Sequence, residues 1–247
     1  MLFRSQPIYA LASSNGERRY LEVLLRLVND DGTLVLPNDF IPAAERYNLM
    51  SAIDRWVIRN VFRCYAEKRG VLAKGDTPVG LAINLSGNSL NEEKLLSYIQ
   101  QQISEFGIPP DIVCFEITET TAISNVKRAA HFIREMKKLH CRFALDDFGT
   151  GVSSFAYLKN LPVDYIKIDG TFVGNIVNNR IDRAMVAAIN QIGHEMGIKT
   201  IAEAAENSAI VERLCALGVD YAQGFVLGRP EPVETEVSPI AACMATR

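Results

Sequence analysis

The residues most able to do chemistry in this chain are carboxylates and amides that end runs of apolar residues. The clearest case is "FALDDFGTG" at 143–151, where apolar residues lead directly into Asp146 and Asp147 and the chain then reaches Gly149 and Gly151. Other polar residues within or at the ends of strand-like runs are Glu22, Asn84, Glu116, Glu119, Lys167, Asp169, Glu203, Glu206 and Gln223. Any one such acid is more often a helix N-cap or a solvated loop residue. Five or more independent runs that end this way predict a shared functional site.

Such an acid cluster needs cations, because carboxylates do not stay ionised in a cleft without them. The candidate ligands are all oxygen donors, and His131, His140 and His194 fall in predicted helical stretches away from the strand ends. Oxygen ligands select hard divalent ions, so the sequence predicts Mg²⁺ or Mn²⁺. Adjacent Asp146 and Asp147 could reach two ions, which suits in-line attack on a phosphodiester. Lys167 taken alone is more readily an ion-pair lysine than a catalytic one.

Eight strand-like runs, mostly separated by helical ones, must position these residues. They are 6–11, 20–28, 79–86, 112–119, 142–147, 163–169, 198–204 and 219–228. Apolar strands that alternate with helices predict a parallel sheet covered by helices, here an irregular α/β (β/α)₈ TIM-type barrel. The connection 12–19 is too short for a crossover helix, so the first strand should be antiparallel. A doubly wound open sheet is the alternative.

The helical runs carry their own expected boundaries. Apolar residues at helical spacing predict a long amphipathic region from Pro42 to about Lys68. A second helix is expected to start at an Asn91 N-cap and to stop at Gly107.

The bulk composition indicates a soluble globular protein rather than a nucleic-acid binder. The chain has 247 residues, 48% hydrophobic residues and a net charge of −3, so we expect no polymeric nucleic acid as a partner. Five scattered cysteines favour a reduced cytoplasmic setting. No signal peptide or long apolar run is evident. The abrupt start in a strand-like run suggests a fragment of a longer protein.

The ordered motifs resemble those of the EAL-domain family, bacterial phosphodiesterases of cyclic diguanylate (c-di-GMP). The family's name motif stands here as Glu22-Val23-Leu24, followed by Leu25-Arg26. The other matching motifs, in family order, are "QPI" at 6–8, "NLS" at 84–86, "FEITE" at 115–119, "DDFGTG" at 146–151, "IKID" at 166–169, "AEAAE" at 202–206 and "QGF" at 223–225. The resemblance covers nearly the whole chain, so we expect a single domain over 1–247, with a disordered tail at 236–247.

The resemblance implies a role for each matching position. One metal would be held by Glu22, Asn84, Glu116 and Asp146. Asp146 would bridge to a second ion that Asp147 also holds, with Glu206 in support. The implied catalytic residues are Lys167, which orients water or screens phosphate, Glu203, the acid near the water, Asp147, and Glu119, which anchors the loop 147–155. The implied substrate-binding residues are Gln6, Leu24, Arg26, which contacts a phosphate, and Gln223, which also orients the cluster.

The expected activity is two-metal hydrolysis of c-di-GMP to linear pGpG. Val23 replaces the family's alanine, and Ala204-Ala205 replaces its usual glycine-valine, but neither change removes a ligand. The alternative function is a catalytically silent c-di-GMP receptor, and a weaker one is an aldolase-like barrel that forms a Schiff base on Lys167. The resemblance also implies a homodimer and a neighbouring GGDEF or sensor domain, with membrane anchoring of the full-length protein left open.

Asp146 and Asp147 also make a local prediction about the backbone. Neighbouring residues in a regular strand point to opposite faces, so both can reach metal only if the backbone leaves strand geometry there. Gly149 and Gly151 allow the turn that follows. We therefore expect 147–155 to form a mobile active-site loop that couples metal occupancy to a dimer interface.

Overall fold

The computed structural model describes residues 1–11, 19–92, 94–151 and 155–233, except 73–78, and the backbone alone for 68–72. The expected tail at 236–247 and the loop residues 152–154 lie outside these ranges. The strands are β1 Leu2–Ala10, β2 Tyr20–Val28, β3 Leu34–Val35, β4 Gly80–Asn84, β5 Val113–Thr118, β6 Arg142–Phe148, β7 Tyr165–Ile168, β8 Lys199–Ala202, β9 Tyr221–Ala222 and β10 Glu231–Pro232.

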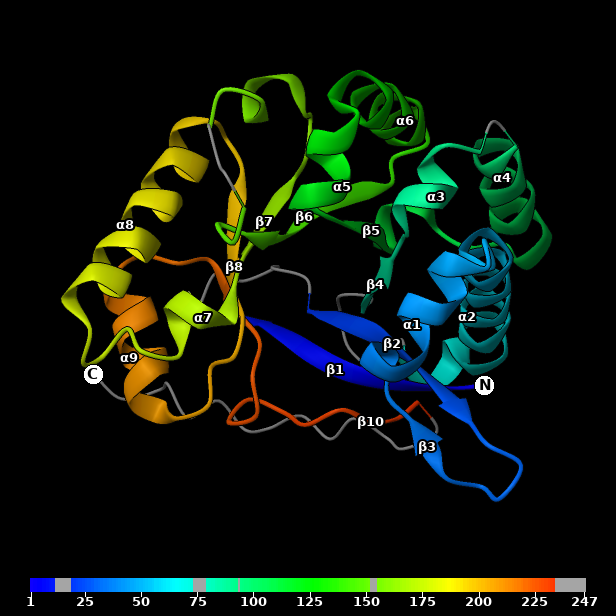
Figure 1. Ribbon diagram of the computed structural model, residues 1–247, viewed down its shortest axis with the longest axis horizontal. Helices are drawn as coiled ribbons and strands as arrows, with labels where there is room; N and C mark the ends of the chain where they lie inside the picture. Colours follow the sequence, from blue (N-terminus) through cyan, green and yellow to red (C-terminus); the bar gives the residue numbers. More distant parts are fainter. Residues whose placement is uncertain (12–18, 73–78, 93, 152–154, 234–247) are drawn as a thin grey trace.

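The sheet closes on itself and forms a barrel (Figure 1). Its strand order is β10-β1-β9-β8-β7-β6-β5-β4-β2-β3, and an additional β1–β2 pairing completes the ring. Strand β1 is antiparallel to both β2 and β9, whereas β2 and β4 to β9 run parallel. The predicted irregular barrel is therefore confirmed, and the doubly wound open sheet is wrong because the ring has no gap.

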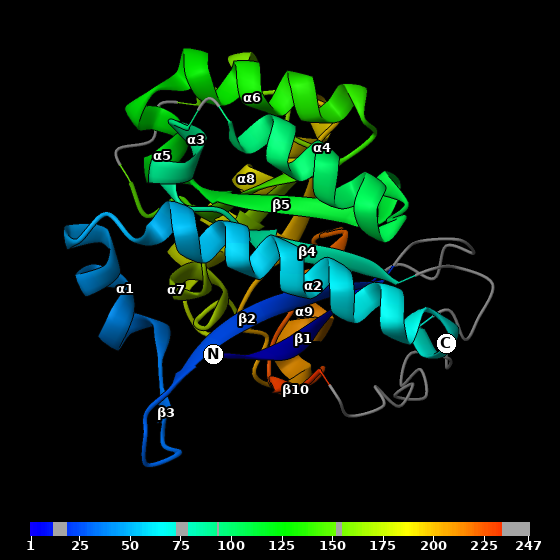
Figure 2. The same cartoon turned by 90° about the vertical axis from the view of Figure 1, so that its right-hand side faces the viewer.

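Helices cover the outside of the barrel (Figures 1 and 2). They are α1 Pro37–Arg46, α2 Met50–Leu72, α3 Gly87–Leu90, α4 Leu95–Phe106, α5 Glu119–Ser124, α6 Val126–Lys138, α7 Gly170–Val173, α8 Arg180–Glu195 and α9 Ser208–Ala216. Asparagine side chains cap three of them, because Asn125, Asn179 and Asn207 accept from backbone N–H groups of the first turns of α6, α8 and α9.

Two helix predictions need correction. The amphipathic region predicted from Pro42 to about Lys68 has other boundaries and is divided between two helices, because α1 ends at Arg46 and Asn48 takes a left-handed φ of 55° before α2 begins. Asn91 does not cap α4, since it follows the short helix α3 as its C-cap residue. Gly107 does end α4, with a left-handed φ of 59°.

The barrel interior is filled in layers, and the lower layer is mostly apolar. Its members are Ile8, Tyr20, Ala82, Cys114, Ala144, Tyr165, Ile201 and Tyr221. The hydroxyls of Tyr20 and Tyr165 lie 3.1 Å apart and satisfy each other inside it. A larger hydrophobic core lies between the strands and the helices, where residues such as Phe115, Phe143 and Ile166 are fully buried. The packed interior leaves the C-terminal ends of the parallel strands as the place for a site.

Candidate active site

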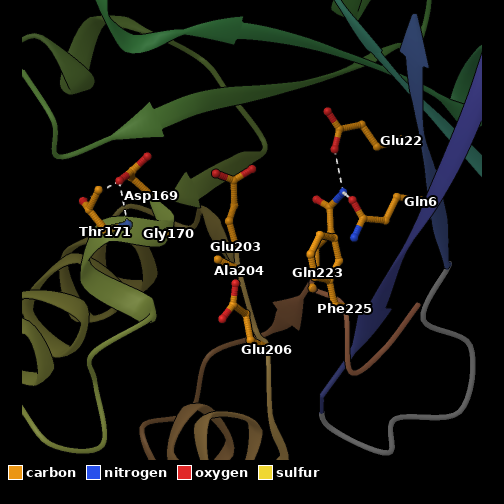
Figure 3. Close-up of a pocket in the computed structure, with 11 residues that line it drawn as sticks. Gln6, Glu22, Asp169, Gly170, Thr171, Glu203, Ala204, Glu206, Gln223 and Phe225 are labelled. Carbon is orange, nitrogen blue, oxygen red and sulfur yellow. Dashed lines mark hydrogen bonds between the residues drawn. The ribbon is translucent and has the colours of Figure 1, made fainter. Parts of the chain in front are cut away.

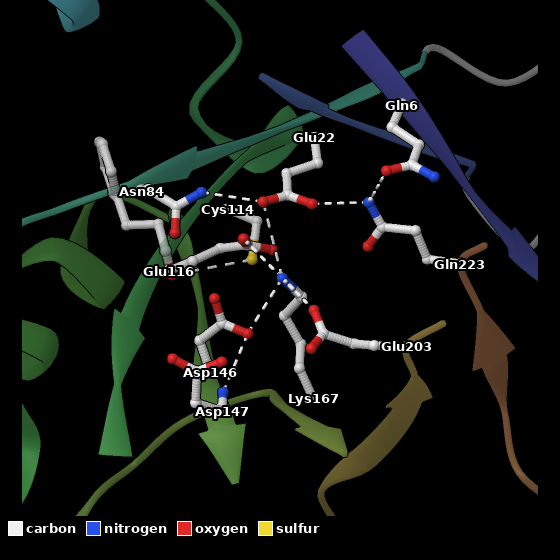
Figure 4. Close-up of polar contacts among 11 residues, drawn as sticks. Gln6, Glu22, Asn84, Cys114, Glu116, Asp146, Asp147, Lys167, Glu203 and Gln223 are labelled. Carbon is white, nitrogen blue, oxygen red and sulfur yellow. Dashed lines mark hydrogen bonds and ion pairs between the residues drawn. The ribbon is translucent and has the colours of Figure 1, made fainter. Parts of the chain in front are cut away.

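A ring of polar side chains lies directly above the apolar layer. Two residues further along each parallel strand, and two residues earlier on antiparallel β1, the inward position becomes polar. The ring consists of Gln6, Glu22, Asn84, Glu116, Asp146, Lys167, Glu203 and Gln223 (Figure 4). The structure thus brings together the metal-ligand, acid and amide positions that the sequence predicted, except for those discussed below.

The ammonium of Lys167 lies at the centre of this ring. Its Nζ is 3.0 Å from Glu116, 3.0 Å from Asp146 and 2.9 Å from Glu203, with Glu22 at 3.7 Å. The Lys167 side chain is fully buried. Burial alone would lower the pKa of Lys167, but the surrounding carboxylates raise it well above its usual value. The amine is therefore a permanent cation, which argues against a Schiff-base lysine.

Glu22 is held ionised by its neighbours. Burial would raise the pKa of Glu22, but Lys167 and hydrogen bonds from Gln223 and Asn84 lower it. Asn84 Nδ2 donates to one oxygen at 2.9 Å and Gln223 Nε2 to the other at 2.6 Å. Gln6 accepts from the same Gln223 amide at 3.2 Å, so both glutamines orient this carboxylate.

Other acids of the ring resist ionisation. Burial, helped by Glu22 and Asp146, raises the pKa of Glu116 well above its usual value despite Lys167. Burial also raises the pKa of Glu203 to about 7, with Lys167 opposing and Asp146 adding to the rise. One ammonium is therefore not enough to keep all the carboxyls around it ionised, and full ionisation of the ring needs further cations.

Asp146 and Asp147 leave regular strand geometry, as their sequence predicted. Asp147 takes a left-handed φ of 53°, and the β6–β7 register shifts between Leu145 and Phe148. As a result Asp146, Asp147 and Glu203 each offer a carboxylate oxygen, and these atoms lie within 4.8 Å of one another. A bulge beside an active site re-aims side chains in this way.

The donor set fits a hard divalent cation. The ligand atoms in the ring are carboxylate and amide oxygens, which Mg²⁺ and Mn²⁺ prefer. Among the described residues, Glu116 Oε1 and Gln223 Oε1 are buried and have no hydrogen-bond partner. Buried polar atoms without hydrogen-bond partners are rare, and a bound ion is one of the accepted explanations.

Glu119 lies outside the ring and holds the chain beyond it. Its buried carboxylate accepts from the Gly149 N–H at 3.0 Å and from the Tyr157 hydroxyl. Gly149 lies near the start of the predicted loop 147–155 and Tyr157 follows its end by two residues, so Glu119 ties the chain on both sides of 152–154 to α5. Tyr157 was not predicted, because a tyrosine in "AYLKN" carries no signal for this contact.

A cavity of about 440 Å³ opens beside the ring (Figure 3). It is lined by Gln6, Glu22, Asp169, Gly170, Thr171, Glu203, Ala204, Glu206, Gln223, Gly224 and Phe225. Glu206 is an exposed wall residue and does not belong to the carboxylate group of Asp146, Asp147 and Glu203. The predicted substrate residues Leu24 and Arg26 are not in this lining and lie further out along β2.

A buried acid that the sequence did not reveal supports the β4 end of the site. Asp54 of α2 is 4% exposed and accepts from the Ser86 backbone N–H at 2.9 Å and the Ser86 hydroxyl at 2.7 Å. Ser86 follows the ligand position Asn84 by two residues and caps α3. Asp54 sits within an amphipathic helix pattern, which gives no sign of an inward carboxylate.

The pKa of Glu203 predicts how stability depends on pH. Because the folded value of about 7 exceeds the usual value of 4.5, this carboxyl stabilises the fold at low pH and the contribution is lost as pH rises through about 7. We expect the Tm of metal-free protein to fall between pH 5 and pH 8, and added Mn²⁺ to raise Tm more at pH 8. Differential scanning fluorimetry tests this, with Glu203→Gln as the control that should flatten the profile. A Tm that rises across this range in EDTA would contradict it.

Ala204 predicts a gain in stability. It has a left-handed φ of 51°, which costs a residue with a Cβ about 1–2 kcal/mol. Ala204→Gly should therefore raise the unfolding free energy by about 1 kcal/mol, since glycine also loses more entropy on folding. Chemical denaturation measures the change, with Ala205→Gly as a control that should destabilise, because Ala205 is buried and has no left-handed φ. An unchanged or lowered midpoint for Ala204→Gly would show that this backbone is unstrained.

Comparisons with known proteins identify the family of the chain. The family model described as "EAL domain" matches residues 1–230. The chain belongs to the EAL-domain family. Cyclic di-GMP phosphodiesterase PdeB of Shewanella oneidensis is 44% identical over all of this EAL domain, which spans 28% of PdeB. Cyclic di-GMP phosphodiesterase PdeF of Escherichia coli is 38% identical over 90% of the domain, which spans 30% of PdeF.

A solved structure of similar sequence has the same fold. The PaMucR phosphodiesterase in its c-di-GMP complex is 30% identical, with a TM-score of 0.85, and the match covers 94% of this EAL domain and 92% of that chain. No helix in the described part of the domain combines the length and apolarity of a membrane span.

Proposed function

We propose that this EAL domain hydrolyses c-di-GMP to linear pGpG with two divalent ions, Mg²⁺ or Mn²⁺. The observation that carries the proposal is the inward ring, whose acids one ammonium does not keep ionised and which has two buried oxygens without hydrogen-bond partners. The names of PdeB and PdeF and the c-di-GMP complex of PaMucR support the substrate. Because the domain spans less than a third of PdeB and of PdeF, activity is proposed for the domain only.

The ring residues divide the proposed metal binding between them. Glu22, Asn84, Glu116 and Asp146 would hold one ion, and Asp147 with the shared Asp146 would hold the other, with Glu206 supporting the site from the cavity wall. The chemistry that divalent ions supply in such a site is charge stabilisation at the phosphorus and activation of water.

The chain's own groups then orient the reactants and move the proton. Glu203, whose pKa is about 7, is suited to accept the proton of the attacking water. Water oxygen bonds to phosphorus, the bond to the 3′-oxygen breaks, and that oxygen takes a proton. Lys167 keeps the carboxylates together and screens the phosphate charge. Gln6, Leu24, Arg26 and Gln223 would contact the substrate, and Glu119 would hold the chain at Gly149.

Chromatography of the reaction mixture tests this function and separates it from the receptor alternative. Incubation with c-di-GMP and Mn²⁺ should give pGpG, excess EDTA should abolish turnover, and Ca²⁺ should inhibit because it prefers more ligands at longer distances. Full turnover in EDTA would rule out the metal mechanism. Binding of c-di-GMP with no product under any divalent ion would favour the receptor, and borohydride trapping of a substrate carbonyl would favour a Schiff base on Lys167.

The setting of the domain is also a proposal. We propose that 1–247 is one domain of a longer signalling protein, in the cytoplasm, next to a GGDEF or sensor domain, and that it forms a homodimer near the loop 147–155. Its small share of PdeB and PdeF supports the longer chain. Light scattering of the purified domain, with and without Mn²⁺, tests the dimer.

A further inference from the structure

Strands β1 and β2 extend the face of the ring outward from the barrel. Gln6 is paired with Glu22, and both side chains point inward. Opposed residues of an antiparallel pair share a face, and so do residues two apart on one strand. The next pairs on the same face are Arg4 with Leu24 and Leu2 with Arg26. At about 3.4 Å per residue, these pairs lie roughly 7 and 14 Å beyond Gln6 and Glu22.

This face lies at the end of the barrel that carries the ring, where the parallel strands have their C-terminal ends. Figure 2 shows β2 continuing to β3 on the side of the molecule where α3, α5 and α7 lie. Both arginines are partly exposed there. Along the surface of β1 and β2, the two positively charged arginines therefore come directly after the acidic residues of the ring.

Neither guanidinium has a carboxylate partner among the described residues. Arg4 Nη1 donates to the Pro230 carbonyl at 3.0 Å, and Arg26 Nη1 donates to the Leu25 carbonyl at 2.7 Å. Arg55 and Arg59, by contrast, are paired with glutamates at 2.6 Å and 2.9 Å. Burial and then repulsion by Arg4 lower the pKa of Arg26, so the two cations are close enough to destabilise each other. An anion between them would relieve that repulsion.

We propose that Arg4, acting with Arg26, binds the second phosphate of the cyclic dinucleotide, and so selects substrates with two phosphates. This inference rests on the proposed function, in which the metal-binding ring takes the first phosphate. The second phosphate cannot remain among carboxylates, and the outward face offers it two guanidinium groups. A guanidinium can form charge-assisted hydrogen bonds with a phosphate, and these are stronger than the bond that Arg4 makes to the neutral Pro230 carbonyl.

The proposal is tested by measuring the binding of c-di-GMP separately from its turnover. Calorimetry with c-di-GMP in Ca²⁺, under conditions without hydrolysis, should show a Kd about 10-fold weaker for Arg4→Gln, as expected for one lost charged hydrogen bond. Its salt dependence should also be weaker. Arg4→Lys should recover part of the affinity. The matched control is Arg19→Gln, which removes the same charge near the other end of β2, where the guanidinium lies over the Tyr9 ring at 5.9 Å.

A substrate with a single phosphate shows whether the effect is selective. Hydrolysis of bis(p-nitrophenyl) phosphate with Mn²⁺ should be equal in wild type and Arg4→Gln, because it uses only the ring. An unchanged Kd for c-di-GMP in Arg4→Gln, an equal loss in Arg19→Gln, or an equal loss on the single-phosphate substrate would overturn the role of Arg4 while leaving the proposed function standing. Wild-type protein that binds no c-di-GMP would instead remove the proposed function, and this inference with it.

Discussion

Replacing Lys167 by methionine is expected to abolish turnover and to destabilise the metal-free domain by about 3–5 kcal/mol, the usual cost of leaving buried charge unpaired. The reason is that Glu116, Asp146 and Glu203 each lie within about 3 Å of its fully buried ammonium. For a domain of this size the loss corresponds to a Tm lowered by roughly 10 °C. The loss should be larger at pH 8 than at pH 5, where these carboxyls can take up protons instead.

Lys137→Met is the matched control for this prediction. Lys137 pairs with Asp164 at 2.7 Å, but both side chains are partly exposed, so its loss should cost no more than about 1 kcal/mol. Added Mn²⁺ should recover part of the Tm lost by Lys167→Met, because cations replace the missing positive charge. A Tm for Lys167→Met close to that of Lys137→Met would show that the ring does not depend on the ammonium.

Replacing Gly149 by valine is expected to lower turnover by about 100-fold or more and to cost about 1–3 kcal/mol of stability, as for other strained backbone positions. Gly149 has a φ of 103°, and a Cβ there would lie 2.8 Å from Phe172 Cε2. Gly149 follows Asp147 by two residues, and its N–H also donates to Glu119. The substitution should therefore displace Asp147 from the carboxylate group.

Gly197→Val separates the effect on the site from backbone strain. Gly197 has a φ of 72° with nothing within 4 Å of an added Cβ, and it lies between α8 and β8. It should lose similar stability and keep turnover at wild-type levels. Paired measurements of Tm and Mn²⁺-dependent turnover decide the question, and full activity of Gly149→Val would mean that this turn does not position Asp147.

The inward ring could be predicted from the sequence because side chains in strands alternate with period two. Each apolar residue of the lower layer fixes the face of its strand, so the polar residue two positions later must point into the barrel, as with Tyr20 and Glu22 or Cys114 and Glu116. The bulge at Asp147 was also predictable, because neighbouring acids cannot otherwise share a site. Barrel closure followed from the number and order of the strands.

Other features depend on contacts that no local pattern encodes. Strand β9 comprises only Tyr221–Ala222, although its apolar run continues. The chain turns away near Gly224, whose backbone lies so close to Ala205 that an added Cβ would be 2.2 Å from the Ala205 carbonyl oxygen. The contact of Tyr157 with Glu119 joins residues 38 positions apart. Taken alone, Lys167 is more readily an ion-pair lysine, and the resemblance implies a catalytic role. Its place at the centre of the ring depends on the closure of all the strands.

The outlying positions of Glu206 and Arg26 have a similar cause. Glu206 follows β8 by four residues, after the left-handed turn at Ala204, and the turn leaves it exposed on the cavity wall. Arg26 lies four residues beyond Glu22 on the same strand, so its position is outside the ring, further along β2. The sequence gives the order of such residues, but not how far a turn or an extended strand carries them.

The central claim is that the ring binds divalent metal through its carboxylates, and Mn²⁺ binding followed by electron paramagnetic resonance tests it most directly. Titration of Mn²⁺ into the domain should deplete the signal of free Mn²⁺, and Mg²⁺ should restore it by competition. Asp146→Asn should weaken this binding by 10-fold or more while the circular dichroism spectrum is unchanged. Equal Mn²⁺ binding by wild type and Asp146→Asn, or no binding by the folded wild type, would contradict the account.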